Sequence, residues 1–144
     1  MAILKDSKII LETLLMFQDG NIESLKYLEN DLNFKIECTF LADKIDKKFT
    51  SFYGVLKDCS DLYFEPWEDE ENIITDPQEI SDLKLEILNT ELEFNDYFKT
   101  YTNCINRFSG GNLFIKAKSI LLFDQEFNHI SYNDILKLNE KIDL

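Results

Sequence analysis

The spacing of apolar residues near the N-terminus predicts two helices joined by a short connection. Ser7 can cap the first helix, over residues 8–18, and Gly20 stands just beyond its end. Asn21 can cap the second helix, which would run to about Leu32. The apolar stripes are Ile10, Leu14 and Phe17 in the first helix and Leu25, Leu28 and Leu32 in the second. The short connection favours an antiparallel pair.

The next part of the chain changes to a period of two, which predicts a strand over residues 33–41. Its apolar positions, as in a half-buried strand, are Phe34, Ile36, Cys38 and Phe40. Residues 43–57 match a helix face, and a helix is the preferred interpretation, although a glycine and the aromatic content of the second half also permit a strand. Residues 61–65 predict a short strand that Pro66 ends, followed by a loop up to position 75.

The strongest local signal is the start of a helix at Asp76. Asp76 is a good N-cap, Pro77 fits the first helical position, and Glu79 completes a capping box. The helical stripe is Ile80, Leu83, Ile87 and Leu88, while a competing strand pattern is Leu83, Leu85 and Ile87. A further helix is expected after position 90, and its apolar residues are Phe94, Tyr97, Phe98, Tyr101, Ile105 and Phe108. Residues 109–111 would end that helix.

The C-terminal part predicts one more strand and one more helix. Residues 112–123 read as a strand, and Ser131 and Asp134 form a capping pair for the last helix. The apolar residues of that helix are Ile135, Leu138 and Ile142. Together the patterns predict a single globular α+β domain over residues 1–144, with several helices packed on a small antiparallel sheet.

The negative charge of the chain is concentrated between Asp58 and Phe98. The formal net charge is −13, and this segment holds fourteen acidic residues against one basic residue, Lys84. The rest of the chain has fourteen of each sign and sums to zero. Such a segment repels phosphates and attracts basic partners, so nucleic acid is not expected as a partner. The alternative is that the charge serves only to keep the protein dispersed in water.

The densest acidic part, residues 65–71, also contains an aromatic residue that could anchor a partner. Trp67 is the single tryptophan, and Tyr63 lies just before it. The alternative for Trp67 is packing at the edge of the core. The candidate partner-binding residues are Asp61, Tyr63, Glu65, Trp67, Glu68, Asp69, Glu70, Glu71, Asp76, Glu79 and Asp82. The last three would continue the acidic surface along the predicted helices.

No motif in the sequence indicates a reaction, so we expect a non-enzyme with no catalytic residue, metal or cofactor. His129 is the single histidine, and there is no CxxC pair, calcium loop or phosphate-binding loop. The apolar runs are too short for a membrane span, and no signal peptide is recognised. Three widely spaced cysteines, Cys38, Cys59 and Cys104, fit reduced thiols and a cytoplasmic location.

In size, charge and composition the chain resembles the small acidic immunity proteins of bacterial toxin–immunity pairs, including contact-dependent growth inhibition systems. That resemblance implies binding to a basic protein, the C-terminal nuclease domain of a cognate toxin, whose active site or substrate groove is blocked by acidic residues. It implies no particular architecture, and from the short apolar runs we expect no membrane partner. Two alternatives stay open: an acidic regulatory or adaptor domain, and a phage-type inhibitor of a nucleic-acid enzyme.

Overall fold

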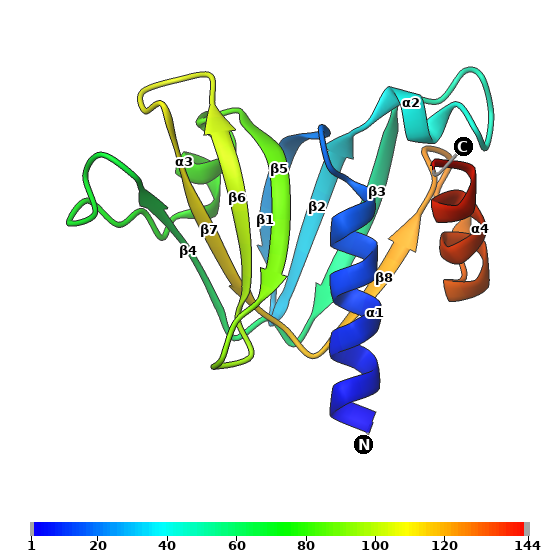
Figure 1. Cartoon of the computed structure of the whole chain (residues 1–144), viewed down its shortest axis with the longest axis horizontal. Coiled ribbons are helices and arrows are strands. Elements are labelled where there is room, and N and C mark those ends of the chain that lie inside the picture. Colours follow the sequence, from blue (N-terminus) through cyan, green and yellow to red (C-terminus); the bar gives the residue numbers. More distant parts are fainter. Residues whose placement is uncertain (1, 143–144) are drawn as a thin grey trace.

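The chain is organised around one antiparallel sheet, shown in the computed structural model of Figure 1. The structure describes the backbone of residues 2–142 and the side chains of residues 7–138. In that part the strands are β1 (Asn21–Leu28), β2 (Asp31–Glu37), β3 (Ser51–Lys57), β4 (Asp61–Pro66), β5 (Leu85–Leu92), β6 (Phe98–Cys104), β7 (Gly110–Lys116), β8 (Ser119–Phe123) and β9 (His129–Ile130). The helices are α1 (Ala2–Met16), α2 (Thr39–Ala42), α3 (Pro77–Asp82) and α4 (Tyr132–Ile142). The strand order is β4-β7-β6-β5-β1-β2-β3-β8-β9.

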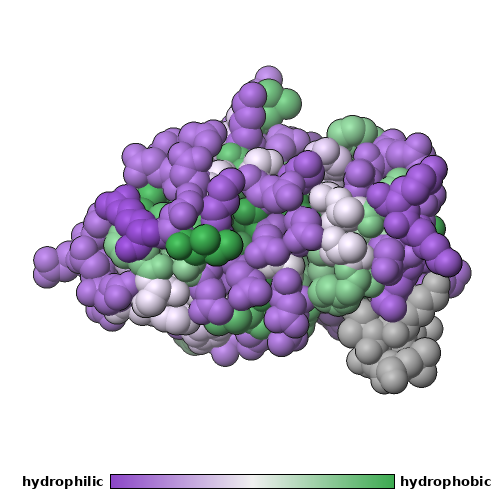
Figure 2. Space-filling view, turned by 90° about the horizontal axis from the view of Figure 1, so that it is seen from above, coloured by the Kyte–Doolittle hydropathy of each residue, from purple (hydrophilic) through white to green (hydrophobic). Residues whose placement is uncertain are grey.

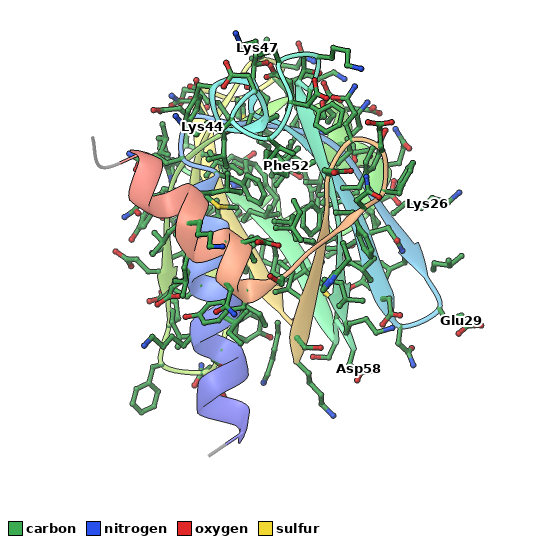
Figure 3. All side chains as sticks on the ribbon, turned by 90° about the vertical axis from the view of Figure 1, so that its right-hand side faces the viewer. Lys26, Glu29, Lys44, Lys47, Phe52 and Asp58 are labelled. Carbon is green, nitrogen blue, oxygen red and sulfur yellow. The ribbon has the colours of Figure 1, made fainter. Side chains whose placement is uncertain are left out.

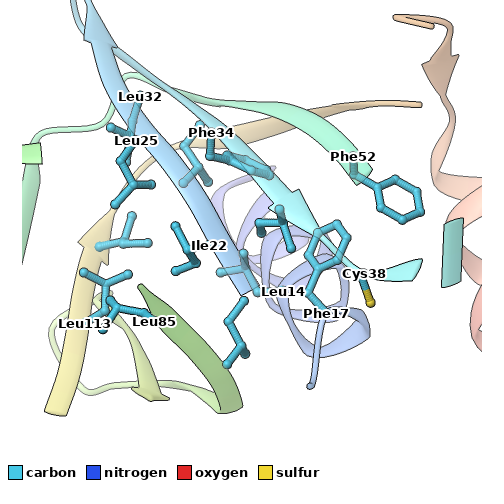
Figure 4. Packing of buried hydrophobic residues seen from close by; sticks show 14 of the residues in the cluster. Leu14, Phe17, Ile22, Leu25, Leu32, Phe34, Cys38, Phe52, Leu85 and Leu113 are labelled. Carbon is cyan, nitrogen blue, oxygen red and sulfur yellow. The ribbon is translucent and has the colours of Figure 1, made fainter. Parts of the chain in front are cut away.

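Alternation along the strands divides the sheet into a buried inner face and a more exposed outer face. The inner side chains and α1 form one hydrophobic cluster (Figure 4). Phe17, which directly follows α1, packs edge-on against Phe52 with ring centroids 5.3 Å apart. Gly54 makes room for the ring of Phe34 on the neighbouring strand, because a Cβ at this position would lie 2.0 Å from the Cζ atom of Phe34.

Between β1 and β5 the sheet is nearly open. Asn21 and Glu86 are the one pair of residues that face each other in register across these two strands. Backbone hydrogen bonds of 2.8 Å join Ile87 to the turn after α1 at the same place. Further along, α3 packs against β1, and Ser81 Oγ accepts a hydrogen bond of 2.9 Å from the Leu25 N–H. The short helix thus takes the place of β5 beside the second half of β1.

The expected fold class, several helices on a small sheet, is wrong. The sheet has nine strands in the described part of the chain, and it dominates the molecule. All of its pairings are antiparallel. Two of the helices are short, with four residues in α2 and six in α3. The prediction failed because several segments with helical spacing form strands.

The segment after Asn21, expected as a helix, forms β1 and the start of β2. A bulge between Ile22 and Ser24 places Ile22 and Leu25 on the buried face three residues apart, which imitates the spacing of a helix. Leu28 is 66% exposed, so it does not belong to a buried stripe. Glu29 next to it has a positive φ of 58°, and this residue turns the chain back into β2.

The preferred helix over residues 43–57 is also wrong, and the strand alternative is correct. Residues 51–57 are β3, in which Phe52 and Leu56 point inward. Tyr53 and Val55 lie on the outer face and are half-buried. Because both faces of this strand carry apolar or aromatic side chains, the simple alternation that would have revealed it is absent.

The cap at Asp76 is confirmed, but the helix that it starts is short. Asp76 Oδ2 accepts a hydrogen bond of 3.2 Å from the Glu79 N–H. The chain leaves α3 after Asp82, and Lys84, with a φ of 56°, turns it into β5. The competing strand pattern is therefore the correct one for the residues that follow. A second bulge, after Ile87, again produces helix-like spacing.

The helix predicted after position 90 is wrong as well, because this part forms the β5–β6 hairpin. Phe94 is fully exposed in the turn, and Phe98 is buried on the inner face. Tyr97 and Tyr101 lie on the outer side instead. The apolar stripe was thus assembled from two faces and a turn. Residues 109–111 do not end a helix, since Gly110 is the first residue of β7.

Several local predictions are confirmed. The first helix exists as α1, and the predicted stripe residues Ile10, Leu14 and Phe17 are buried, but the helix begins at Ala2, so Ser7 lies inside it and the prediction of Ser7 as its cap is wrong. The strands predicted over residues 33–41 and 61–65 correspond to β2 and β4, although β2 ends at position 37. Ser131 and Asp134 cap α4 reciprocally. The strand expected over residues 112–123 is two strands, β7 and β8, and the side chain of Ile142 lies outside the described residues.

We expect Ser81→Ala to lower the free energy of unfolding by about 1–3 kcal/mol, because the buried Leu25 N–H would lose its acceptor. Urea unfolding followed by circular dichroism would measure the change. Ser24→Ala on the exposed side of β1 is the matched control and should change stability by less than about 0.5 kcal/mol. Equal effects of the two substitutions would contradict the role given to Ser81.

Candidate functional site

The edge strand β4 carries three of the predicted partner-binding residues on its outer side. Asp61, Tyr63 and Glu65 are half-buried and alternate with Leu62, Phe64 and Pro66, which are buried. This strict alternation fixes which side chains point outward. The structure therefore brings Asp61, Tyr63 and Glu65 together on one surface, as the sequence led us to expect.

Neighbouring strands extend this surface with further aromatic rings. We define the aromatic face as Tyr63 of β4, Phe114 of β7, Tyr101 of β6 and Tyr97 just before β6. Tyr63 and Phe114 stand opposite each other in register, and their rings stack with centroids 4.7 Å apart. Tyr97 meets both rings edge-on, at 6.0 and 6.4 Å. All four side chains are half-buried, so part of each ring remains accessible.

Two lysines lie over rings of the aromatic face. Lys99 Nζ is 4.8 Å from the ring centroid of Tyr101 and 6.0 Å from that of Phe114. The same ammonium is 3.8 Å from a carboxylate oxygen of Glu93. Lys116 Nζ is 5.4 Å from the ring centroid of Tyr97. Cations at such distances are attracted by the negative face of the ring.

Carboxylates at the border of the aromatic face bind its tyrosine hydroxyls. Tyr97 donates a hydrogen bond of 2.5 Å to Asp61 Oδ2, and Tyr101 donates one of 3.1 Å to Glu91. The bond to Asp61 raises the pKa of Tyr97 to about 12, because the phenol must keep its proton to donate this bond, and burial and the negative charge of Asp61 add to the shift. Asp61 also accepts the Leu62 N–H, so its position is fixed from two sides.

An exposed acidic loop follows directly on β4. We define it as residues 67–71, which are all exposed and include Glu68, Asp69, Glu70 and Glu71. The chain after β4 projects from the left of Figure 1, and the view from above shows a largely hydrophilic surface at that end (Figure 2). Glu68 Oε1 accepts hydrogen bonds from the backbone N–H and the hydroxyl of Ser109, at 2.6 and 3.0 Å. The loop is thus tied to the β6–β7 turn.

Trp67 both packs at the edge of the core and remains accessible to a partner, which were the two alternatives considered from the sequence. Its indole packs against Gly110, where an added Cβ would lie 2.5 Å from the Cζ3 atom of the ring. Its Nε1–H donates a hydrogen bond of 2.8 Å to Asn112 Oδ1 on β7. The side chain is nevertheless 43% exposed. Trp67 is therefore held at the edge of the sheet and still offers ring surface to a partner.

The backbone of β4 is blocked on its free side. Phe64 exchanges two hydrogen bonds with Ile74, of 2.8 and 2.9 Å, and Pro66 has no N–H to offer. The Leu62 N–H is taken by the side chain of Asp61. An incoming chain therefore finds no open N–H row at which to add a strand. Recognition at this edge has to use side chains.

The acids of α3 are exposed, and no hydrogen bond or ion pair joins them to the aromatic face in the described part of the chain. Asp76 serves as the helix cap, and Asp82 accepts a hydrogen bond from Gln78. The backbone oxygen of Asp82 accepts a bond of 2.9 Å from Asn106, on the same turn that holds the acidic loop. Glu79 is exposed, and no side-chain bond of Glu79 is present in the described part of the chain. The helix thus reaches this turn. The second helix along which the acidic surface was expected to continue does not exist, because residues 85–92 and 98–104 form β5 and β6.

Sequence reasoning missed the residues that neighbouring strands bring to β4. These are Tyr97, Lys99, Tyr101, Phe114 and Lys116. Tyr97, Lys99 and Tyr101 fall in the segment that was predicted as a helix, and Phe114 and Lys116 fall in the strand expected over residues 112–123, for which no neighbouring strand was predicted. In residues 112–118 the apolar Leu113, Ile115 and Ala117 alternate with Phe114, Lys116 and Lys118. The aromatic and basic character of this second set is the signal that could have indicated a functional outer face.

The cysteines and the single histidine lie outside this surface. Burial raises the pKa of the Cys38 thiol to about 12, that of Cys104 to about 11, and also that of Cys59. His129 is exposed on β9, next to the ring of Phe123. Among the residues whose side chains are described, no three histidine, cysteine or acidic groups cluster as metal ligands would.

Comparison of the chain with known protein families, curated proteins and solved structures gives no match. In the described part, none of the helices has the length and apolar character needed to cross a membrane. The functional interpretation therefore rests on the geometry of the acidic loop and the aromatic face.

We expect Asp61→Asn to lower the pKa of Tyr97 from about 12 toward its ordinary value of 10.0, because the hydrogen-bonded carboxylate is the main cause of the shift. The raised pKa means that this bond stabilises the fold fully below pH 10 and is lost as the pH rises toward 12. A titration of labelled tyrosine followed by NMR would measure the change.

Asp96→Asn is the matched control for this titration, since it removes one exposed acid from the turn next to Tyr97. Asparagine tolerates the positive φ of 66° at that position. The pKa of Tyr97 should stay near 12 in this variant. A Tyr97 pKa that Asp61→Asn leaves unchanged would contradict the assignment.

Proposed function

We propose that the protein is an immunity protein that binds and neutralises a cationic toxin domain with nuclease activity. The observation that supports this most is the exposed acidic loop held beside the aromatic face at one edge of the sheet. Carboxylates would occupy the sites where a nuclease binds the phosphates of its substrate. The rings would supply the anchoring contacts that charge alone does not give.

The charge of the loop suits rapid binding of a basic partner. Four consecutive carboxylates, Glu68 to Glu71, are exposed on a chain whose formal net charge is −13. A concentrated negative surface steers a basic protein into contact and raises the association rate at low salt. Salt screens such attraction over about 8–10 Å at physiological ionic strength, so the loop acts mainly on groups that come close to it.

The anchoring of the loop supports a role in binding beyond general repulsion between copies. Glu68 is tied to Ser109, and Trp67 is tied to Asn112 on β7. Asp69, Glu70 and Glu71 are then presented from a fixed base. A surface that is ordered before binding loses less conformational entropy on binding. A charge that served only to keep the chain dispersed would not need these bonds.

The proposed partner is the C-terminal domain encoded by the gene immediately upstream. We expect the triple substitution Asp69→Lys, Glu70→Lys and Glu71→Lys to weaken binding to that domain by about tenfold or more at low salt. It should also flatten the salt dependence of the affinity and abolish growth rescue on co-expression. Glu68 is left unchanged because it supports the loop. Calorimetric titration at low and moderate salt would measure both effects.

The matched control reverses three exposed acids elsewhere, through Glu29→Lys, Asp43→Lys and Glu126→Lys. These residues belong to segments other than the acidic loop, since Glu29 lies between β1 and β2, Asp43 follows α2 and Glu126 lies between β8 and β9. Glu29 and Lys44 are labelled in Figure 3. This variant has the same net charge and should lose much less affinity. No binding and no rescue by the unchanged protein would overturn the proposed function, and equal losses in both variants would move the interface away from the loop.

A further inference from the structure

The two lysines over the aromatic face lie close to attractive groups, which are rings for both lysines and, for Lys99, a carboxylate as well. For Lys99 these are the rings of Tyr101 and Phe114 and the carboxylate of Glu93. For Lys116 the ring is that of Tyr97, whose hydroxyl binds Asp61. Asp61 stands directly opposite Lys116 in the β4–β7 register. The same combination would attract any ammonium or guanidinium group that could reach it.

We infer that the aromatic face binds basic side chains of a protein partner, and that Lys99 and Lys116 occupy the positions that the partner's arginines or lysines take. This inference rests on the proposed function for the existence of a basic partner. It adds where and how the partner is recognised, by insertion of cations between rings and acids. In the free protein Lys99 and Lys116 fill these positions over the rings, and the arginines or lysines of the partner displace them.

The contacts of the two lysines are weak enough to be exchanged. The Lys99–Glu93 pair is 3.8 Å long and partly exposed, and such surface pairs contribute little to stability. A lysine ammonium is a compact point charge on a flexible stem. The planar guanidinium of arginine stacks on a ring and can bind a carboxylate with two hydrogen bonds at once. An arginine from a partner would therefore use these positions better than the internal lysines do.

The structure of the edge strand favours the same mode of recognition. The free side of β4 is blocked by Ile74, by Pro66 and by the side chain of Asp61. A partner therefore cannot extend the sheet and has to approach the outer side chains. The acidic loop borders that surface through Trp67, which is fixed to Asn112 on β7. Acids and rings thus form one continuous surface for a basic segment.

Removing the internal lysines should tighten binding of a basic partner. The double substitution Lys99→Met and Lys116→Met keeps the apolar stems over the rings and frees the cation positions. We expect the affinity for a six-residue arginine peptide, and for the toxin domain, to rise by about three- to tenfold. Calorimetry would give the affinities, and NMR shifts of Tyr63, Tyr97, Tyr101 and Phe114 on adding the peptide would locate the site.

A matched control separates this effect from the change in net charge. Lys26 on β1 and Lys47 after α2 are exposed, and in the described part of the chain neither lies over a ring or pairs with a carboxylate. The double substitution Lys26→Met and Lys47→Met therefore removes two positive charges without freeing a cation position. Its affinity for the arginine peptide and for the toxin domain should change by less than about twofold.

The outcomes distinguish this inference from the proposed function. Equal tightening in both double variants would show long-range attraction alone and would overturn the inference, as would unchanged or weaker binding after Lys99→Met and Lys116→Met. If the toxin domain binds but the two variants behave alike, the inference fails and the proposed function stands. If the toxin domain does not bind, yet the arginine peptide is bound more tightly by the first variant only, the inference stands and the proposed function fails.

Discussion

The contact between the turn after α1 and the strand β5 holds the two halves of the sheet together. Asp19 N–H binds the carbonyl of Ile87, and Ile87 N–H binds the carbonyl of Gly20, both at 2.8 Å. Beyond the single pair of Asn21 and Glu86, β1 and β5 share no further register positions in the described chain. The two strands can diverge here because α3 covers the opening. Ser81 of α3 accepts the hydrogen bond of the Leu25 N–H on β1, which β5 does not reach. The inner faces of both halves then line one hydrophobic core.

The candidate site depends on this arrangement, since all of its side chains lie in the half that begins at β5. Packing on the inner face fixes the strands, and strand alternation then fixes which side chains point outward. Two glycines at the start of β7 complete the geometry. Gly111 lies under the ring of Phe64 and Gly110 under that of Trp67, at distances that leave no room for a Cβ atom. The position of the acidic loop thus depends on residues without side chains.

The features that could be predicted from the sequence are those that depend only on a short run of neighbouring residues. The caps of α3 and α4, the strand β4 and the acidic loop depend on neighbouring residues and were predicted correctly, and the first helix was predicted apart from its start, which lies at Ala2 and not after Ser7. The failures came from bulges after Ile22 and Ile87, which turn a strand period into a helical one. They also came from strands such as β6, where aromatic side chains occupy the outer face. The aromatic face itself could not be predicted, because it exists only through pairings between distant strands.

The blocked side of β4 also bears on how copies of this chain behave toward each other. A sheet with many strands presents its end strands as templates on which identical chains can stack, which is the first step of fibre formation. Here proline, a short returning segment at Ile74 and an aspartate occupy that template. The adjacent run of carboxylates adds repulsion between copies that approach edge to edge. The edge that offers side chains to a basic partner therefore also protects the chain against polymerisation when it is abundant.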